Sequence, residues 1–309
     1  MDLRTHPALR PFLVHENGGA GARLPAVFDC DGTVIKGDIG EAMLYRQIEQ
    51  FLFRRSPADV WEDHPRHGEL DDAFSRLRAL DPSLRRGDPR FPLFADIILS
   101  WYFDQIAEGN VAKACADIVR LFAGYSLDEV RAIADDTFRD EISAPFSERR
   151  LGSRTLPRGV RFLRETSLLV KGLVESGTEV WAVSGSSVWS VEPVFRALGV
   201  PAERVIGIDL EMDGGVFTPV PRVPIPIRGE KVGALKARTT AQPGLVASDS
   251  KNDIPLFRYS QRVKIFVNSR NRDPEEFFRK GNVRRDDSWI VVENPTPEEG
   301  NDESWQTYR

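Results

Sequence analysis

Phe28-Asp29-Cys30-Asp31-Gly32-Thr33-Val34 is the stretch of this 309-residue sequence that decides its fold. Its two aspartates come directly after the apolar run 24–28, which is predicted to form a β-strand. In extended backbone, side chains at positions i and i+2 point the same way, so both carboxylates can face one pocket. Two anions aimed at one place repel each other unless a cation or a proton lies between them. Because Asp-x-Asp-Gly also occurs in ordinary turns, the rest of the chain must decide between a site and a turn.

The composition excludes several classes of function. The formal net charge is −5, the pI is near 5.6 and the arginines are scattered, so there is no basic field for a nucleic acid. No apolar run approaches the roughly 20 residues of a membrane span, and residues 1–23 lack the apolar region of a signal peptide. Cys30 and Cys115 are far apart and lack metal-binding spacing. We expect a cytoplasmic protein without nucleic-acid or membrane partners, and the oligomeric state is not indicated.

The rhythm of apolar residues divides the chain into segments. Residues 1–23 are a loose lead-in, residues 37–155 follow helical spacing, and residues 294–309 form an acidic tail. Between them, short apolar strands alternate with helices, which is typical of a mostly parallel sheet covered on both faces. We therefore predict a doubly wound, Rossmann-like α/β core of residues 24–36 and 156–293. An inserted all-helical domain interrupts this core after its first strand.

Four polar segments stand out against this pattern. The predicted strands cover residues 24–28, 179–183, 204–208, 245–247, 263–267 and 289–292, with a β-hairpin expected at 210–217. The polar segments cover residues 29–33, 183–186, 229–236 and 248–253. In open α/β sheets, ligand sites lie beyond the carboxyl ends of the strands. Asp29, Ser184 and Asp249 each follow a predicted strand, so we expect them to meet at one edge of the sheet.

The second and third segments offer groups that bind an anion. Ser184 supplies a hydroxyl and Gly185 a backbone amide between a strand end and a helix start, where the helix dipole is positive. The alternative for this segment is that Ser184 or Ser186 only caps the helix. Lys231 is a compact cation that can lie against a phosphate, although most helix lysines are solvated and Lys236 is a rival on the same helix.

Asp249 and Asp253 complete a set of groups suited to phosphoryl transfer. Carboxylates, together with waters and phosphate oxygens, form the oxygen shell that Mg²⁺ prefers. In such a site one aspartate attacks phosphorus, and a second protonates the leaving oxygen and then activates water. The metal ion and a lysine neutralise the phosphoryl oxygens, while the Ser184 hydroxyl and the Gly185 amide hold the transferring group.

The order of these segments resembles the haloacid dehalogenase superfamily over residues 24–292. The resemblance implies that Asp29 is the nucleophile that forms an aspartyl-phosphate and that Asp31 is the acid/base. Ser184 is similar to the second motif and Lys231 to the third. The implied Mg²⁺ ligands are the Asp29 side chain, the Asp31 backbone carbonyl, Asp249, and Asp253 directly or through water.

The subgroup follows from two further similarities. An aspartate two residues after the nucleophile is similar to the phosphatase and phosphomutase branch. A helical cap inserted between the first and second motifs (a C1-type cap) resembles the phosphoserine-phosphatase-like subgroup. Asp38 occupies a position similar to the acidic residue that binds the serine ammonium there. Arg120, the nearest arginine for the serine carboxylate, is out of register, and the family's Ser-Gly-Gly second motif is here Ser184-Gly185-Ser186.

The aromatic segment 98–104 raises a second substrate class. Trp101 and Tyr102, with aromatic residues elsewhere, could enclose a quaternary ammonium through cation–π contacts. The layout also resembles phosphorylcholine phosphatases. The other aromatic residues considered are Tyr45, Trp61 and Trp189. The competing and favoured interpretation is that Trp101 and Phe103 belong to the core of the cap.

The sequence therefore predicts a Mg²⁺-dependent phosphoric monoester hydrolase acting on a small phosphate ester, phosphoserine-like or phosphocholine-like. The alternatives are a phosphomutase or phosphotransferase of the same superfamily, a phospho-accepting signalling receiver, and a non-catalytic binding relative. The natural substrate is not determined by the motifs, because specificity depends on the geometry of cap side chains.

Overall fold

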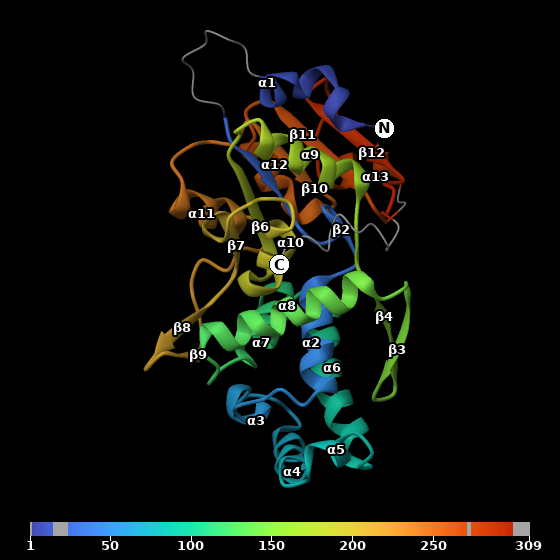
Figure 1. Ribbon diagram of the computed structural model, residues 1–309, viewed down its shortest axis with the longest axis vertical. Coiled ribbons are helices and arrows are strands. Elements are labelled where there is room, and N and C mark those ends of the chain that lie inside the picture. The colour runs from blue at the N-terminus through green and yellow to red at the C-terminus, as the bar shows by residue number, and fades with distance from the viewer. Residues whose placement is uncertain (1, 15–23, 271–272, 299–309) are drawn as a thin grey trace. The chain divides into compact units, whose positions relative to one another are not determined.

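The computed structural model describes residues 2–14, 24–270 and 273–298, and these fall into two compact units (Figure 1). The first, the sheet unit, comprises residues 1–38, 160–207 and 224–309. The second, the helical unit, comprises residues 39–159 and 208–223. The helical unit thus includes the segment 208–223, which the sequence had assigned to the core. No helix in the described part of the chain is long and apolar enough to cross a bilayer.

The sheet unit is built on a six-stranded sheet in the order β12-β11-β10-β1-β6-β7 (Figure 1). Its strands are β1 (Ala26–Phe28), β6 (Val180–Ser187), β7 (Val205–Ile208), β10 (Leu245–Ser248), β11 (Val263–Asn268) and β12 (Trp289–Glu293). Strand β1 pairs in parallel with both β6 and β10, and β11 pairs in parallel with β10 and β12. The predicted doubly wound α/β fold is confirmed.

Helices cover this sheet because its strands carry apolar side chains on both faces. Val27 and Val246 belong to one buried cluster with Leu235, Phe257 and Phe277 from three helices. Those helices are α11 (Glu230–Arg238), α12 (Ile254–Tyr259) and α13 (Pro274–Lys280). The sheet unit also contains η1 (Leu3–Thr5), η2 (Pro7–Leu9), α1 (Arg10–Leu13), α9 (Arg164–Glu175), α10 (Val188–Arg196), η3 (Ala202–Arg204), η4 (Lys251–Asp253) and the short antiparallel pair β2 (Ile35–Lys36) and β5 (Arg161–Phe162).

The register of the central strands brings the predicted motif segments to one edge. Phe28 is level with Ala182 of β6 and with Ala247 of β10. The Asp29 amide continues the ladder by donating to the Ala247 carbonyl at 3.0 Å. The residues that follow Phe28, Ala182 and Ala247 therefore emerge together at the carboxyl ends of three adjacent parallel strands, where sites form in such sheets.

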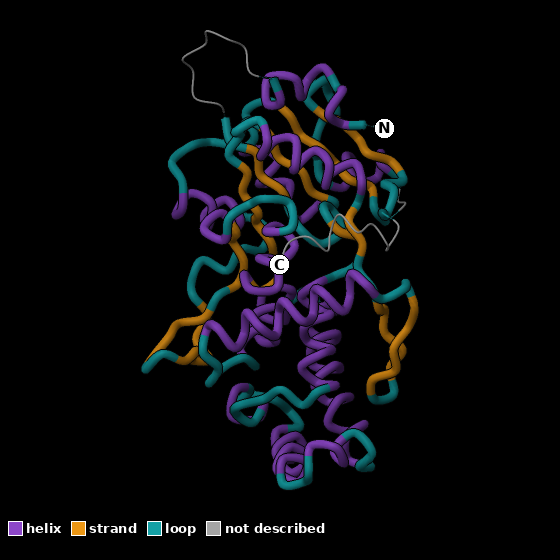
Figure 2. Tube along the Cα trace, in the orientation of Figure 1, coloured by secondary structure: helices purple, strands orange, loops and turns teal. Residues whose placement is uncertain are grey.

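The helical unit contains seven helices within the described residues (Figure 2). They are α2 (Ile39–Glu49), α3 (Pro57–Val60), α4 (His67–Arg78), α5 (Pro82–Arg85), α6 (Arg90–Ala107), α7 (Val111–Arg120) and α8 (Leu127–Ser143). Ser126 and Glu129 form a capping box at the start of α8, so two backbone amides at this helix end have side-chain partners. Phe51, Phe74 and Phe94 lie with ring centroids 5.2–6.3 Å apart and form part of the core of the unit.

Two β-hairpins make the insertion less uniform than the predicted all-helical domain. Strands β3 (Ser147–Leu151) and β4 (Arg154–Arg158) pair antiparallel, with Leu151 and Leu156 as their buried apolar side chains. Only two apolar residues mark this hairpin, which is too weak a pattern to distinguish from loop. Its turn uses Gly152 at φ +61°, where a Cβ would lie 2.2 Å from Asp96 Oδ1.

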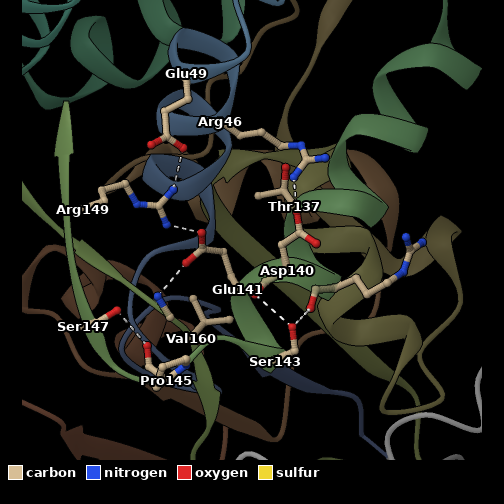
Figure 3. Close-up of polar contacts among 12 residues, drawn as sticks. Arg46, Glu49, Thr137, Asp140, Glu141, Ser143, Pro145, Ser147, Arg149 and Val160 are labelled. Carbon is tan, nitrogen blue, oxygen red and sulfur yellow. Dashed lines mark hydrogen bonds and ion pairs between the residues drawn. The ribbon is translucent and has the colours of Figure 1, made fainter. Parts of the chain in front are cut away.

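An ion-pair cluster anchors the β3–β4 hairpin to the helices. Arg149 of β3 lies between Glu49 of α2, at 3.3 Å, and Glu141 of α8 (Figure 3). Glu141 also accepts the Gly159 amide at 2.6 Å and is 5% exposed. Because both carboxylates have a charged partner, the cost of burying them is offset by hydrogen bonding.

The second hairpin, β8 (Leu210–Asp213) with β9 (Val216–Pro221), confirms the predicted hairpin but extends further along the chain. Phe217 is 1% exposed and forms two backbone hydrogen bonds with the segment that follows α7. Its carbonyl accepts the Gly124 amide at 2.7 Å, and its amide donates to the Tyr125 carbonyl at 2.8 Å. The hairpin therefore adds to the helical unit although it follows β7 of the sheet.

Candidate active site

Asp29, Lys231 and Asp253 form a buried hydrogen-bonded chain at the carboxyl edge of the sheet. The Lys231 ammonium donates to Asp29 Oδ1 at 2.9 Å and to Asp253 Oδ2 at 2.8 Å. The exposed fractions of the three residues are 7%, 5% and 2% for Asp29, Lys231 and Asp253. Ser248, the last residue of β10, donates its hydroxyl to Asp253 Oδ2 at 2.6 Å. Asp29 and Asp253, which are 202 and 22 positions from Lys231 in the sequence, thus share its ammonium group.

Asp249 lies beside this chain, against the turn that follows Asp31. Gly32 has φ +73°, and a Cβ there would lie 2.4 Å from Asp249 Oδ2 and 3.1 Å from Ser269 Oγ. Only glycine meets both the backbone conformation and the close approach. Asp249 Oδ2 forms an ion pair with Arg270 Nε at 3.1 Å but accepts no hydrogen bond among the described residues. A buried carboxylate oxygen is thus directed toward the loop that carries Asp29 and Asp31.

The electrostatics of this group are those of an anion-rich site with too few cations. Burial raises the pKa of Asp29 to about 8, with Asp253 and Asp249 adding to the rise and Lys231 opposing it. Burial also raises the pKa of Asp249 to about 6, against the attraction of Arg270. For Lys231, the carboxylates of Asp253 and Asp29 outweigh burial, which by itself lowers a lysine pKa, and the net shift is upward. Lys231 is therefore held in its charged form.

Ser184, Gly185 and Ser186 lie in the last part of β6, which runs to Ser187 directly before α10, so this strand is longer than the predicted 179–183. Ser184 is 1% exposed, and its Oγ accepts the Ser186 amide at 3.1 Å. The Ser186 hydroxyl in turn donates to Asp31 Oδ2 at 2.7 Å. The N-cap of α10 is Ser187, whose Oγ accepts the Ser190 amide at 3.3 Å. The capping role considered for Ser184 or Ser186 therefore belongs to Ser187. A Cβ on Gly185 would lie 3.3 Å from the Ile227 side chain.

The sequence did not predict the contacts of three residues at the site: Ser186, Ser248 and Arg270. Ser248 begins the polar segment 248–253 but ends a buried strand, and Arg270 is one of many scattered arginines. Ser186 did carry a signal, because it stands where the resembled motif has glycine.

Cys30, between the two aspartates, is fully buried. Burial, and to a smaller extent the charges of Asp31, Asp29 and Asp38, raise the pKa of its thiol well above the usual range. Asp38 is half-buried at the end of the first segment of the sheet unit.

The predicted cap residues make polar contacts inside the helical unit. Trp101 donates its indole N–H to Asp117 Oδ2 at 2.9 Å, and Lys113 lies 4.8 Å from the centre of its ring. Tyr102 and Tyr45 both donate to Glu41, at 3.2 and 2.7 Å. Trp61 is fully buried, and the centre of its ring lies 6.1 Å from the centre of the Trp101 ring. Trp101 and Tyr102 therefore have separate polar partners.

Arg120, the nearest arginine considered for a substrate carboxylate, is held by three groups of the helical unit. Its guanidinium donates to Asp117 Oδ1 at 2.9 Å, to the Pro219 carbonyl at 3.0 Å and to the Val60 carbonyl at 2.5 Å. Because its side chain joins α7 to α3 and β9, a structural role accounts for this residue.

No group of three or more His, Cys, Asp or Glu side chains in the described part of the chain has the arrangement of a metal site. The carboxylates nevertheless fit a cation. Asp253 adds to the rise in the pKa of both Asp29 and Asp249, and Lys231 is shared between Asp29 and Asp253. A divalent cation held by two carboxylates and a backbone carbonyl needs no third acidic side chain.

Comparison with known proteins agrees with this architecture. The sequence matches the haloacid dehalogenase-like hydrolase family over residues 26–258. It is 31% identical over 165 residues to a phosphoserine phosphatase of Halobacterium salinarum, covering 48% of this chain and 77% of that protein.

Two solved structures share the fold. A conserved protein of unknown function from Anaerococcus prevotii has a TM-score of 0.72 at 18% identity, covering 88% of this chain and 87% of its own. A protein of unknown function from Bordetella pertussis has a TM-score of 0.55 at 21% identity, covering 89% and 100%. With three quarters of its length matched by the family, this chain belongs to the haloacid dehalogenase-like hydrolases.

Proposed function

We propose that this protein is a Mg²⁺-dependent phosphatase that hydrolyses a small organic phosphate monoester through an aspartyl-phosphate on Asp29. The observation that carries the proposal is the buried lysine bridge, in which Lys231 joins Asp29 to Asp253 at 2.9 and 2.8 Å. Such a bridge holds the nucleophile in one position and places a permanent positive charge beside the phosphoryl group that it attacks.

The reaction has two steps. An Asp29 carboxylate oxygen forms a bond to phosphorus while the bond between phosphorus and the ester oxygen breaks, and Asp31 gives its proton to the departing oxygen. Asp31, now ionised, takes a proton from a water molecule that attacks phosphorus, and the bond to Asp29 breaks to release inorganic phosphate. The Ser184 hydroxyl has its oxygen bound by the Ser186 amide, which leaves its hydrogen available for a phosphoryl oxygen.

The residues that would hold Mg²⁺ are Asp29 and Asp249 by their side chains and Asp31 by its backbone carbonyl, with Asp253 acting directly or through water. When bound, the ion supplies positive charge that stabilises the phosphoryl oxygens. Asp249 Oδ2 supports this assignment, because within the described residues it is buried, accepts no hydrogen bond and has the Arg270 ion pair as its printed charged contact.

For the substrate, we infer a phosphoserine-like monoester as the first candidate. The H. salinarum relative is named a phosphoserine phosphatase, and Asp38 offers a carboxylate for an ammonium group. Because Arg120 is bound by Asp117, Pro219 and Val60, a substrate carboxylate must find another partner. Phosphocholine, which lacks that carboxylate, is the second compound to test, with Trp101 and Tyr102 as the residues to vary.

Substitution of the nucleophile tests the proposal. Asp29→Asn keeps the volume of the side chain and an oxygen for Lys231, so the protein should fold with an unchanged circular dichroism spectrum. Hydrolysis of p-nitrophenyl phosphate with Mg²⁺ should fall by at least about a thousandfold, because the covalent step is lost. Asp72→Asn, at an exposed position of α4, is the matched control and should retain full activity.

Full activity of Asp29→Asn would remove the nucleophile assignment. The same assay separates hydrolysis from group transfer. A phosphomutase or phosphotransferase would move labelled phosphate to an organic acceptor without releasing free phosphate, whereas we expect stoichiometric release. A signalling receiver is disfavoured because the chain belongs to a hydrolase family.

A further inference from the structure

We propose that Ser186 is a positioning residue for Asp31, which orients the carboxyl group that delivers the proton to the leaving oxygen. The inference rests on the proposed phosphatase function and adds to it a residue that the motif pattern does not include. It starts from one contact, the 2.7 Å hydrogen bond that the Ser186 hydroxyl donates to Asp31 Oδ2.

The backbone of Ser186 is held from two directions. Its amide donates to Ser184 Oγ at 3.1 Å. On the other side, β7 approaches so closely that a Cβ on Gly207 would lie 2.7 Å from the Ser186 carbonyl oxygen and 2.5 Å from the Val188 nitrogen. Because the end of β6 packs this closely against β7, the hydroxyl of Ser186 meets Asp31 from a well-defined position.

Within the described part of the chain, the bond to Asp31 is the one hydrogen bond that the structure gives for the Ser186 hydroxyl. Helix capping is performed by the next residue, Ser187, whose side chain bonds the Ser190 amide. The resembled motif carries glycine at position 186, so the hydroxyl at this end of β6 is a donor that the motif does not supply. A side chain that does not cap α10 but is bonded to Asp31 points to a role in orienting Asp31.

The consequence for catalysis is a fixed orientation of the general acid. A hydrogen bond at Oδ2 restricts rotation of the Asp31 carboxyl about its Cβ–Cγ bond. In the first step the O–H bond of the protonated Asp31 carboxyl breaks as the leaving oxygen takes the proton, and its electron pair remains on Asp31. A general acid that is held in one orientation contributes most when the leaving group is basic, since a poorly basic oxygen departs with little need of a proton.

The test compares two esters of similar shape, phenyl phosphate and p-nitrophenyl phosphate, of which phenol is the more basic leaving group. We expect Ser186→Gly to lower kcat/KM for phenyl phosphate by about tenfold or more and for p-nitrophenyl phosphate by less than about threefold. The ratio kcat/KM reports the step in which Asp29 is phosphorylated, so slow hydrolysis of the phospho-enzyme does not mask the difference. Ser186→Thr keeps the hydroxyl and should restore most of the loss.

Ser187→Ala is the control for a damaged loop, because it removes the cap of α10. It should lower the melting temperature and affect both esters by the same factor. Equal losses on the two esters in Ser186→Gly, no loss at all, or no recovery in Ser186→Thr would overturn the inference. Should Ser186→Gly fold poorly, Ser186→Ala gives the same comparison with the hydroxyl removed. A wild-type protein without activity on either ester would instead contradict the proposed function.

Discussion

Lys231 is the residue on which the geometry of the site depends most. Its ammonium is nearly inaccessible and has two carboxylate partners, Asp29 and Asp253. A buried ion pair adds little net stability over an apolar substitute, but removal of one partner leaves the other charges buried without compensation. The lysine therefore matters for the folding of the site as well as for its chemistry.

We expect Lys231→Ala to lower the free energy of unfolding by about 3 kcal/mol in metal-free buffer, because two carboxylates lose their shared cation. Urea unfolding followed by circular dichroism measures the change. Lys236→Ala is the matched control on the same helix, since Lys236 is exposed and lies 4.9 Å from the centre of the Tyr259 ring. It should cost less than about 1 kcal/mol. Equal effects of the two substitutions would contradict the role given to Lys231.

Among the elements, the β8–β9 hairpin is the one whose place the pattern of residues did not reveal. It follows β7 in the chain, yet it belongs to the helical unit with residues 39–159. The contacts responsible are backbone bonds between Phe217 and the segment after α7, and the Arg120 side chain, which reaches Pro219. In the chain, the hairpin joins β7 to the segment that leads to α11.

Arg120→Ala should loosen this hairpin. The change removes three hydrogen bonds from a charged donor and leaves the Pro219 and Val60 carbonyls without that partner, so we expect a loss of about 2–4 kcal/mol. Hydrogen exchange of the amides in residues 210–221 should speed up more than exchange in β10. Arg76→Ala removes an exposed pair with Asp72 and should leave the urea midpoint of unfolding unchanged. Unchanged protection of the hairpin in Arg120→Ala would show that its backbone bonds suffice.

On the scale of the whole molecule, the site gathers carboxylates from both ends of the sheet unit. Asp29 comes from the first strand, and Asp249 and Asp253 from more than 200 residues later. Burial raises the pKa values of Asp29 and Asp249 in the folded protein, and repulsion from Asp253 adds to both. A cation that binds the folded arrangement but not the unfolded chain must then stabilise it by mass action.

We expect Mg²⁺ to raise the melting temperature, with a gain of about 2.7 kcal/mol when its concentration is a hundred times the dissociation constant. Calorimetric scans with added Mg²⁺ and with a chelator measure the effect. The gain should be confined to the sheet unit, seen as slower hydrogen exchange in β1 and β10 and unchanged exchange in α4. Asp249→Asn should abolish it, and a variant that still gains as much as the wild type would exclude Asp249 as a ligand.

The sequence alone was sufficient for the fold class and for the positions that gather at the sheet edge. Apolar alternation and strand ends are local properties, and parallel pairing in register carries Asp29, Ser184 and Asp249 to the same edge whatever the loops do. The helical character of the insertion was also readable, because helical spacing is repeated over many residues.

Only the tertiary structure decided which side chains contact one another there. The choice of Lys231 over Lys236, the hydroxyl of Ser186 on Asp31, and the use of Arg120 as a structural bridge depend on distances between segments far apart in the chain. Such contacts leave no periodic trace in a sequence, since hydrogen-bond geometry is determined by the packing of whole elements and not by the spacing of residues along one of them.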